Sequence, residues 1–213
     1  MKYRHQTYSI GDHEITLRTL LDLDQFSDSE GKARAAGISK EAFPLFGVVW
    51  TSSEILAEWL LTFDVAGLRI LEVGCGMALV AHSLNARGAD ITAMDIHPRA
   101  QELFFDNVAL MGSAKIPFVT SSWAENPAGL GEFDLIVGAD ILYEPKHIQT
   151  LPAFIDRHAR QSAEVIIADP GRGDLTEFQK TMNEHGFDRS VISPALSDHM
   201  GRPYQGVIYH YQR

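Results

Sequence analysis

Several features that mark other classes of protein are scarce or missing in this sequence. Cys75 is the single cysteine, so no internal disulfide can form and a reducing compartment is indicated. No apolar run approaches the roughly 18 residues of a membrane-spanning helix. The first ten residues, MKYRHQTYSI, are too polar for a secretory signal. We therefore expect a cytoplasmic protein with no membrane contact.

Basic residues are also few, and the known metal and nucleophile motifs are missing. Lys and Arg number 18 against 28 Asp and Glu, which gives a net charge of −10. This balance argues against a nucleic-acid partner and suits a basic one, although solubility explains it equally well. The nine histidines form no H-E-x-x-H or Cys/His pattern, and no G-x-S-x-G occurs. We expect no metal.

The 213 residues, 45% of them hydrophobic, are enough for one domain with a real core. Residues 8–20 alternate around a Gly-Asp turn and predict a hairpin, and 22–39 predict a surface loop or short helix. Residues 51–54, TSSE, predict a capping box at the start of a helix. Further strands are expected at 70–73, in the apolar run after Gly88 that ends at Asp95, and at 117–120, 133–138, 163–168, 187–192 and 207–211. Further helices are expected at 77–88, 98–111, 145–160 and 175–185.

The most informative stretch, residues 69–98, predicts a strand, a tight turn, a helix and a second strand that ends in an acid. Gly74 and Gly76 let the backbone bend sharply and approach a ligand, because no Cβ intervenes. Asp95 follows about 20 residues later, where a ribose diol would be held. The alternative is an ordinary strand–helix–strand crossover with a glycine turn.

The residues around this turn distinguish between nucleotide ligands. A dinucleotide site has G-x-G-x-x-G, but the third position of that pattern is Leu79. Glu72 precedes the turn, and an acid there would repel pyrophosphate but suit a cationic ligand with an amino group. S-adenosylmethionine is such a ligand, since it combines a sulfonium, an ammonium and a ribose.

This E-x-G-x-G pattern with its following acid resembles motif I and the acidic motif of class I, or seven-strand, methyltransferases. Ala78 stands where that family usually has a third glycine. The resemblance implies an α/β, Rossmann-like sheet of order 3-2-1-4-5-7-6 with helices on both faces. It also implies S-adenosylmethionine as cofactor. We expect a methyltransferase domain over 47–213 and an N-terminal extension, a hairpin and loop, over 1–46.

The resemblance also implies further cofactor contacts. The segment Gly47-Val-Val-Trp50-Thr-Ser resembles the G-x-x-x-W-P-[SA] segment of a subfamily rich in protein-lysine methyltransferases, and implies that Trp50 lines the pocket. Packing in the core is the alternative for Trp50. The expected cofactor-binding residues are Trp50, Glu72, Gly74, Cys75, Gly76, Asp95, Ile96 near the adenine, Ser122 in place of a usual acid, Trp123 over the adenine, and Ala139.

Asp140 and Tyr143 are the expected catalytic residues. D-x-x-Y resembles the D-x-x-[FY] motif of the same subfamily, and lacks both prolines of [DN]-P-P-[YFW]. The resemblance implies that Asp140 holds the acceptor amine and that Tyr143 forms one wall. A nearby carboxylate raises the pKa of an amine, so Asp140 suits orientation better than deprotonation. A capping or loop role for Asp140, and packing for Tyr143, are the alternatives.

Two later segments bear on the acceptor. Asp169-Pro-Gly-Arg172 resembles a segment of the lysine methyltransferases directed at the electron-transfer flavoprotein β-subunit, and Arg172 would contact substrate or cap the loop. The connection 193–206 is long enough to reach the site. The sequence favours N-methylation of a lysine in an exposed basic protein segment. Methylation of a small-molecule amine or of another side chain, and a non-catalytic cofactor-binding module, stay open.

Overall fold

Seven strands form one mixed sheet in the computed structural model, which describes residues 1–171 and 175–213. The order is β5-β4-β3-β6-β7-β9-β8, and β9 alone runs in the opposite direction to the other six strands. Numbered along the sheet-forming chain, this is the expected order 3-2-1-4-5-7-6. The strands are β3 (Arg69–Val73), β4 (Asp90–Asp95), β5 (Phe118–Thr120), β6 (Phe133–Ala139), β7 (Ala159–Asp169), β8 (Asp188–Ile192) and β9 (Val207–Gln212).

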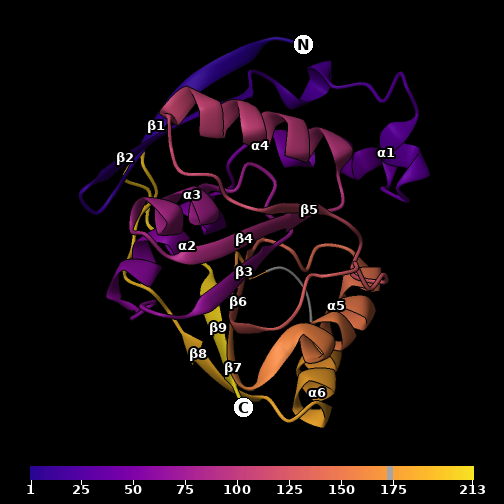
Figure 1. Cartoon of the computed structure of the whole chain (residues 1–213), viewed down its shortest axis with the longest axis vertical. Helices are drawn as coiled ribbons and strands as arrows, with labels where there is room; N and C mark the ends of the chain where they lie inside the picture. Colours follow the sequence, from indigo (N-terminus) through magenta and orange to yellow (C-terminus); the bar gives the residue numbers. More distant parts are fainter. Residues whose placement is uncertain (172–174) are drawn as a thin grey trace.

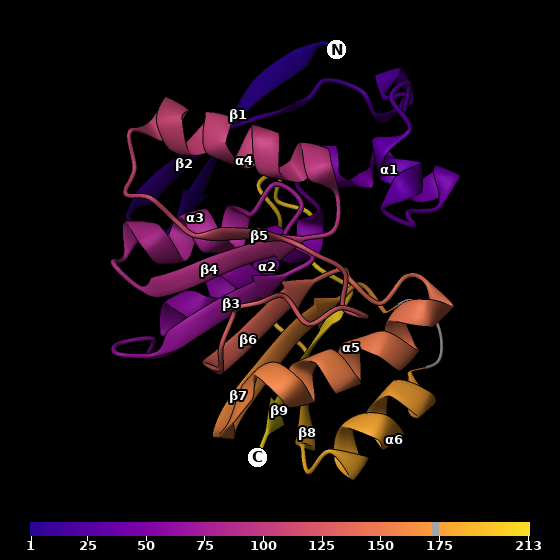
Figure 2. The same ribbon diagram turned by 45° about the vertical axis from the view of Figure 1, so that its right-hand side comes forward.

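Helices cover both faces of this sheet, as Figure 1 shows. Residues of α2 (Thr51–Trp59), α3 (Leu79–Ala86) and α4 (Pro98–Met111) belong to one buried cluster, and those of α5 (Pro145–His158) and α6 (Thr176–Glu184) to the other. Side chains of a strand alternate between the clusters, because successive residues point to opposite faces. Figure 2 shows α5 and α6 side by side on their face. The α/β fold predicted from the sequence is therefore confirmed.

Two helix starts contrast in how well the sequence predicted them. Helix α4 begins at Pro98 and ends at Met111, as the sequence predicted, and Gly112 follows it in the left-handed region. The capping box expected at 51–54 is wrong, since no side chain caps the first residues of α2. Glu54 is buried instead, and its Oε2 accepts hydrogen bonds of 2.8 Å from the backbone and ring of His199. A distant segment has therefore taken the carboxylate that local capping would have used.

The N-terminal hairpin packs into the main core. It consists of β1 (Tyr3–Ile10) and β2 (His13–Leu20), so it starts five residues earlier than the sequence predicted. Its inward side chains join the cluster under α3 and α4, and the backbone N–H of Arg18 donates to Asn107 Oδ1 at 2.7 Å. Residues 22–39 carry the short helix α1 (Lys32–Ala35). No helix in the described part of the chain has the length and apolar character that a bilayer crossing requires.

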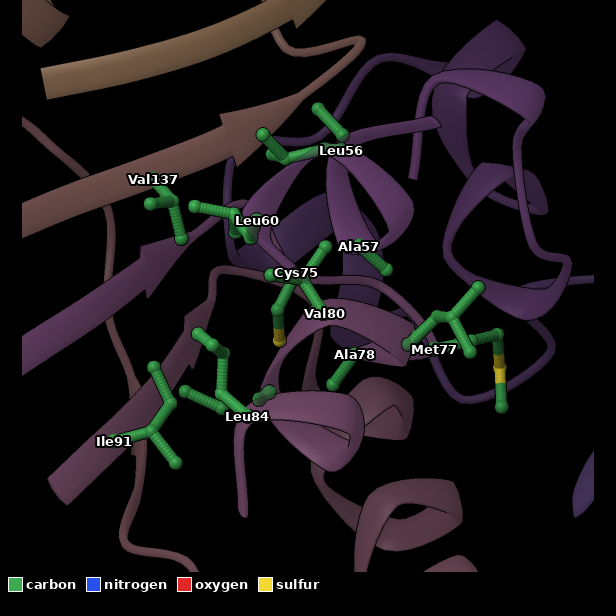
Figure 3. Close-up of a cluster of buried hydrophobic side chains, with 14 of the residues drawn as sticks. Leu56, Ala57, Leu60, Cys75, Met77, Ala78, Val80, Leu84, Ile91 and Val137 are labelled. Carbon is green, nitrogen blue, oxygen red and sulfur yellow. The ribbon is translucent and has the colours of Figure 1, made fainter. Parts of the chain in front are cut away.

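The core directly supports the loop between β3 and α3. Figure 3 shows Leu56 of α2 and Leu60, which directly follows that helix, close to Cys75, with Val80 and Leu84 of α3 also near it. All of these side chains are almost fully buried. Close packing of this kind leaves the loop few alternative positions. The glycine turn is thus held by the two helices on either side of it.

Candidate active site

The turn after β3 adopts backbone conformations that favour glycine. Gly74 and Gly76 have φ of 61° and 52°. A Cβ on Gly74 would lie 2.8 Å from Ile141 Cγ2, and one on Gly76 would lie 3.3 Å from the Phe46 carbonyl oxygen. Any larger residue would therefore be strained and would fill the space beside the turn. Ala78 also has a positive φ, 55°, although it carries a Cβ.

Asp95 ends the neighbouring strand and joins it to this turn. Its Oδ2 accepts a hydrogen bond of 2.7 Å from the Gly76 N–H, and its Oδ1 accepts one of 2.8 Å from the His97 N–H. Burial raises the pKa of this carboxyl, while the two backbone donors act in the opposite direction. A carboxylate has about four lone-pair positions, so each oxygen can accept one more hydrogen bond. That arrangement suits the two hydroxyls of a ribose.

A cavity of about 330 Å³ lies at the carboxyl ends of the strands, where open α/β sheets bind ligands. Its lining includes both the turn and the end of β6. The structure brings to this one cavity all of the predicted site residues except Glu72, namely Trp50, Gly74, Cys75, Gly76, Asp95, Ile96, Ser122, Trp123, Ala139, Asp140 and Tyr143.

Glu72 requires a correction to the role expected for it. It is 2% exposed and is not among the residues that line the cavity. Its Oε2 accepts a 2.8 Å hydrogen bond from the Ala81 N–H in the first turn of α3. Burial raises the pKa of Glu72 to about 8, so much of it is protonated near neutral pH. Glu72 therefore supports the helix behind the turn and does not face a cationic ligand.

Trp50 and Trp123 reach the cavity from two segments that lie far apart in the sequence. Trp50 precedes α2, and its Nε1–H donates to the Leu45 carbonyl at 3.0 Å. The loop that carries Trp123 is fixed by Glu125, whose Oε2 accepts from Ser121 Oγ at 2.7 Å and from the Ser122 N–H at 2.9 Å. Both indoles are only partly buried and line the cavity. Trp50 is therefore not a plain core residue, which was the alternative considered for it.

Asp140 and Tyr143 follow the end of β6 and also line the cavity. Asp140 has a φ of 56°, and its N–H donates to the Ala168 carbonyl at 2.8 Å. Strained backbone of this kind persists only where the surrounding structure holds it, and is frequent at functional sites. The ring of Tyr143 lies edge-on to His147, with 4.9 Å between ring centroids. The motif that predicted the catalytic pair therefore places it on the cavity wall.

His147 is a site residue that the sequence analysis missed. It lies between Tyr143 and Trp123, edge-on to both rings with 4.9 Å to each centroid. Its Nδ1 is 2.8 Å from the Ile141 carbonyl oxygen, which can only accept, so Nδ1 carries the proton. Burial lowers the pKa of His147, and the ring is neutral near pH 7. The signal in the sequence that could have predicted His147 was its position four residues after Tyr143, in the first turn of α5.

His97 was missed as well. It follows Ile96, lines the cavity and stacks on Phe46, with 3.9 Å between ring centroids and 18° between ring planes. Burial lowers the pKa of His97 to about 4, so the ring stays neutral and acts as an aromatic wall. An apolar, aromatic wall beside the ribose position suits the flat base of a nucleoside.

Segments from outside the sheet complete the cavity. Ala36, Gly37 and Ile38 line it, although they belong to the predicted N-terminal extension. The connection 193–206 contributes none of the lining residues that the structure describes. It packs on α2 instead, where the hydroxyls of Tyr204 and Ser52 are 2.9 Å apart. Arg172 lies outside the described residues, so its predicted role stays a prediction.

The residues present fit S-adenosylmethionine. The glycine turn leaves space that any Cβ would take, Asp95 keeps acceptor positions for a diol, and aromatic rings flank the remaining walls. The fold and this site together define a class I, S-adenosylmethionine-dependent methyltransferase. Among residues 1–171 and 175–213 no group of three or more His, Cys, Asp or Glu side chains forms a metal site.

Comparison with known proteins gives the family. Residues 42–185, more than half of the chain, match the model of the lysine methyltransferase family. The chain belongs to this family. It is 31% identical over 117 residues to protein N-lysine methyltransferase METTL21A of Danio rerio, an alignment that covers 51% of each protein.

Other relatives are more varied in their named activities. Magnesium-protoporphyrin O-methyltransferase of Rhodobacter capsulatus is 37% identical over 79 residues, or 37% of this chain and 34% of that protein. The chain thus spans about half or less of the length of these curated relatives. The magnesium protoporphyrin IX methyltransferase of Synechocystis PCC 6803 with bound SAM has a TM-score of 0.61 at 17% identity, over 91% of this chain and 98% of that one. At that identity the likeness shows the fold alone.

Proposed function

We propose that this methyltransferase N-methylates a lysine side chain in an exposed, basic segment of a protein substrate. One observation carries the proposal: Asp140 and Tyr143, the D-x-x-Y pair, line the same cavity as Asp95 and the glycine turn. The site for a methyl donor and the site for an acceptor would then be continuous. The relative METTL21A, named as a protein N-lysine methyltransferase, supports the same acceptor.

On the donor side, the chain would bind S-adenosylmethionine through both backbone groups and side chains. Asp95 would accept hydrogen bonds from the ribose hydroxyls, and the turn around Gly76 would approach the amino-acid part closely. Ile96, Ser122 and Trp123 would surround the adenine. When bound, the cofactor supplies a methyl group on a sulfonium, which is already a good leaving group.

On the acceptor side, the chain would orient the amine and exclude water. An amine attacks through its lone pair, so it must arrive neutral, whereas a free lysine has a pKa of about 10.4. The Asp140 carboxylate would accept a hydrogen bond from the amine and direct the lone pair at the methyl group. The rings of Tyr143 and His147 would form the wall beside it and favour the cationic product. Positioning of this kind supplies much of the rate in a displacement reaction.

The charge of the cavity wall supports a cationic acceptor over an anionic one. The described lining contains the carboxylates of Asp95, Asp140 and Glu144, and its single Lys or Arg is Lys146. A carboxylate-bearing acceptor would be repelled by this wall. A small-molecule amine would satisfy the same charges, so it stays the alternative acceptor. The cytoplasmic location and the lack of a nucleic-acid partner stay predictions.

The test is transfer of label from methyl-labelled S-adenosylmethionine to a heat-treated extract of the source organism. We expect label in one or a few protein bands with the wild-type protein and none with Asp140→Ala. Hydrolysis of a labelled band should release methyl-lysine. Label confined to the small-molecule fraction would contradict the protein acceptor. No transfer to either fraction, from protein that binds S-adenosylhomocysteine, would favour the non-catalytic module.

A further inference from the structure

A contact between distant parts of the chain crosses one side of the cavity. Ser39 Oγ donates to Glu144 Oε1 at 2.7 Å, although 105 positions separate the two residues. Lys146 Nζ lies 2.8 Å from Glu144 Oε2 and donates to the Gly37 carbonyl at 3.1 Å. Gly37, Glu144 and Lys146 all line the cavity. Glu144 is thus the point at which the N-terminal segment, helix α5 and the cavity meet.

The environment of Glu144 is that of a carboxylate kept charged. Its side chain is only 18% exposed, whereas that of Lys146 is 48% exposed. Burial acts to raise the pKa of Glu144, but the hydrogen bonds from Lys146 and Ser39 lower it overall. A partly buried carboxylate needs a cation or a donor beside it, because leaving it unpaired is costly. In this structure an ammonium group of the chain itself supplies that cation.

Glu144 also adjoins the part of the wall assigned to the acceptor. It directly follows Tyr143 in the sequence, and His147 Nε2 lies 3.8 Å from Glu144 Oε2. Because His147 Nδ1 carries the proton, Nε2 of the neutral ring presents a lone pair toward the same region. A second ammonium group placed here would meet a carboxylate, an imidazole acceptor and an aromatic ring. A neutral or anionic group would meet no comparable set of partners.

We propose that Glu144 is a specificity-determining residue that receives the ammonium of the incoming acceptor, and that Lys146 occupies this position as an internal stand-in until the acceptor replaces it. The inference rests on the proposed amine acceptor and extends it. The exchange replaces one ammonium by another, so the carboxylate stays paired throughout. Lys146 is half-exposed and can turn into solvent, where its charge is hydrated. The acceptor then lies next to Tyr143, on the way to Asp140.

The test is a titration of the S-adenosylhomocysteine-saturated protein with butylammonium, a probe with the length and charge of a lysine side chain, followed by NMR. Glu144→Gln removes the charge but keeps the shape, and we expect it to weaken butylammonium binding by about tenfold. Lys146→Met removes the internal competitor, and we expect binding about threefold tighter than in the wild type. The neutral analogue 1-butanol should not distinguish the variants.

Two control variants separate charge recognition from general effects. Lys180→Met removes a lysine that pairs with Glu184 on the surface of α6, away from the cavity lining, and should leave the affinity unchanged. Ser39→Ala breaks the bond between the N-terminal segment and Glu144 but keeps the carboxylate, and should change the affinity by less than about twofold. If Ser39→Ala weakened butylammonium binding as much as Glu144→Gln does, the inference would be overturned. The contact between the N-terminal segment and the cavity would then explain both losses of affinity.

Equal affinities in the wild type, Glu144→Gln and Lys146→Met would also overturn it. The two experiments distinguish a failure of this inference from a failure of the proposed function. Label transfer to protein lysine by all three proteins, with equal butylammonium affinities, would remove the role of Glu144 and leave the function. The expected changes in butylammonium affinity, with label reaching only small molecules, would keep the cation site and remove the protein acceptor.

Discussion

The two halves of the cavity are built in different ways. The centre of the donor half, formed by the β3–α3 turn and Asp95, uses backbone groups and one buried carboxylate that lie within a single strand–helix–strand unit. The acceptor half, around Asp140 to His147, uses side chains and is completed by Gly37 and Ser39 from far away in the sequence. The first half is fixed by local geometry, and the second by packing between remote segments. This difference suits a shared cofactor on one side and a variable acceptor on the other.

The largest expected effect tests the donor half. Asp95→Ala removes the acceptor for two backbone donors and for a ribose diol, so we expect the Kd for S-adenosylhomocysteine to rise by about 100-fold or more. Isothermal titration calorimetry measures the change, and the melting temperature should fall as well. Asp90→Ala, at the exposed start of the same strand, is the matched control and should bind normally. An unchanged Kd in folded Asp95→Ala would remove Asp95 from the donor site.

The next effect should be confined to the acceptor half. Asp140→Asn keeps a residue that tolerates the left-handed backbone, so the fold and the Kd for S-adenosylhomocysteine should change little. Methyl transfer should fall by about 100-fold, because the amine loses the carboxylate that orients it. Turnover of the labelled protein substrate is the measurement. Equal losses of binding and turnover would show that the two halves are not separable at this residue.

The variant Glu72→Gln tests whether a residue behind the glycine turn contributes to the fold rather than to the donor half of the cavity. The pKa of Glu72, raised from 4.5 to about 8, means that the folded state binds this proton more tightly than the unfolded state. The free energy of unfolding should therefore fall as pH rises through this window, by up to about 1.4 kcal/mol per pH unit, and Glu72→Gln should remove that part of the slope. Urea denaturation of both proteins across the window measures the difference.

The same variant tests the correction made for Glu72. The glutamine oxygen can still accept from the Ala81 N–H, and the residue does not line the cavity, so S-adenosylhomocysteine affinity should stay within about threefold. A folded Glu72→Gln protein that no longer binds S-adenosylhomocysteine would restore the direct ligand contact that the sequence predicted.

The smallest expected effect concerns Ala78, which stands where class I methyltransferases usually have a third glycine. Ala78 and Ala81 are both fully buried, but only Ala78 has a positive φ. Each change to glycine loses a buried methyl group, whereas Ala78→Gly also relieves left-handed strain, so it should be about 1 kcal/mol less destabilising than Ala81→Gly. Denaturant midpoints compare the two variants. Equal losses would mean that the turn holds Ala78 without strain.

Particular residues show how far the sequence alone could predict the site. The spacing from Gly74 to Asp95 predicted the donor half, because Gly74 follows β3 and Asp95 ends the adjacent parallel strand β4, so that the two meet at one sheet edge. The spacing of Asp140 and Tyr143 placed both beyond β6 at the same edge. Glu54 was misassigned, since its partner His199 lies 145 positions away and no local pattern reports such a contact. His147 was missed because its role depends on two rings, one of them in a different loop.

The sequence by itself predicted the glycine turn and the acid at the end of the following strand, because the spacing of apolar residues, glycines and acids acts over one or two adjacent elements. The strand order and the D-x-x-Y pair were predicted from the resemblance of these motifs to class I methyltransferases. Only the tertiary structure decided that Glu72 faces the core, that Glu54 binds a remote histidine, and that Ser39 and Lys146 converge on Glu144. Those outcomes depend on which surfaces bury one another. A carboxylate is satisfied by whichever donor packing brings within reach, and that donor need not be near it in the sequence.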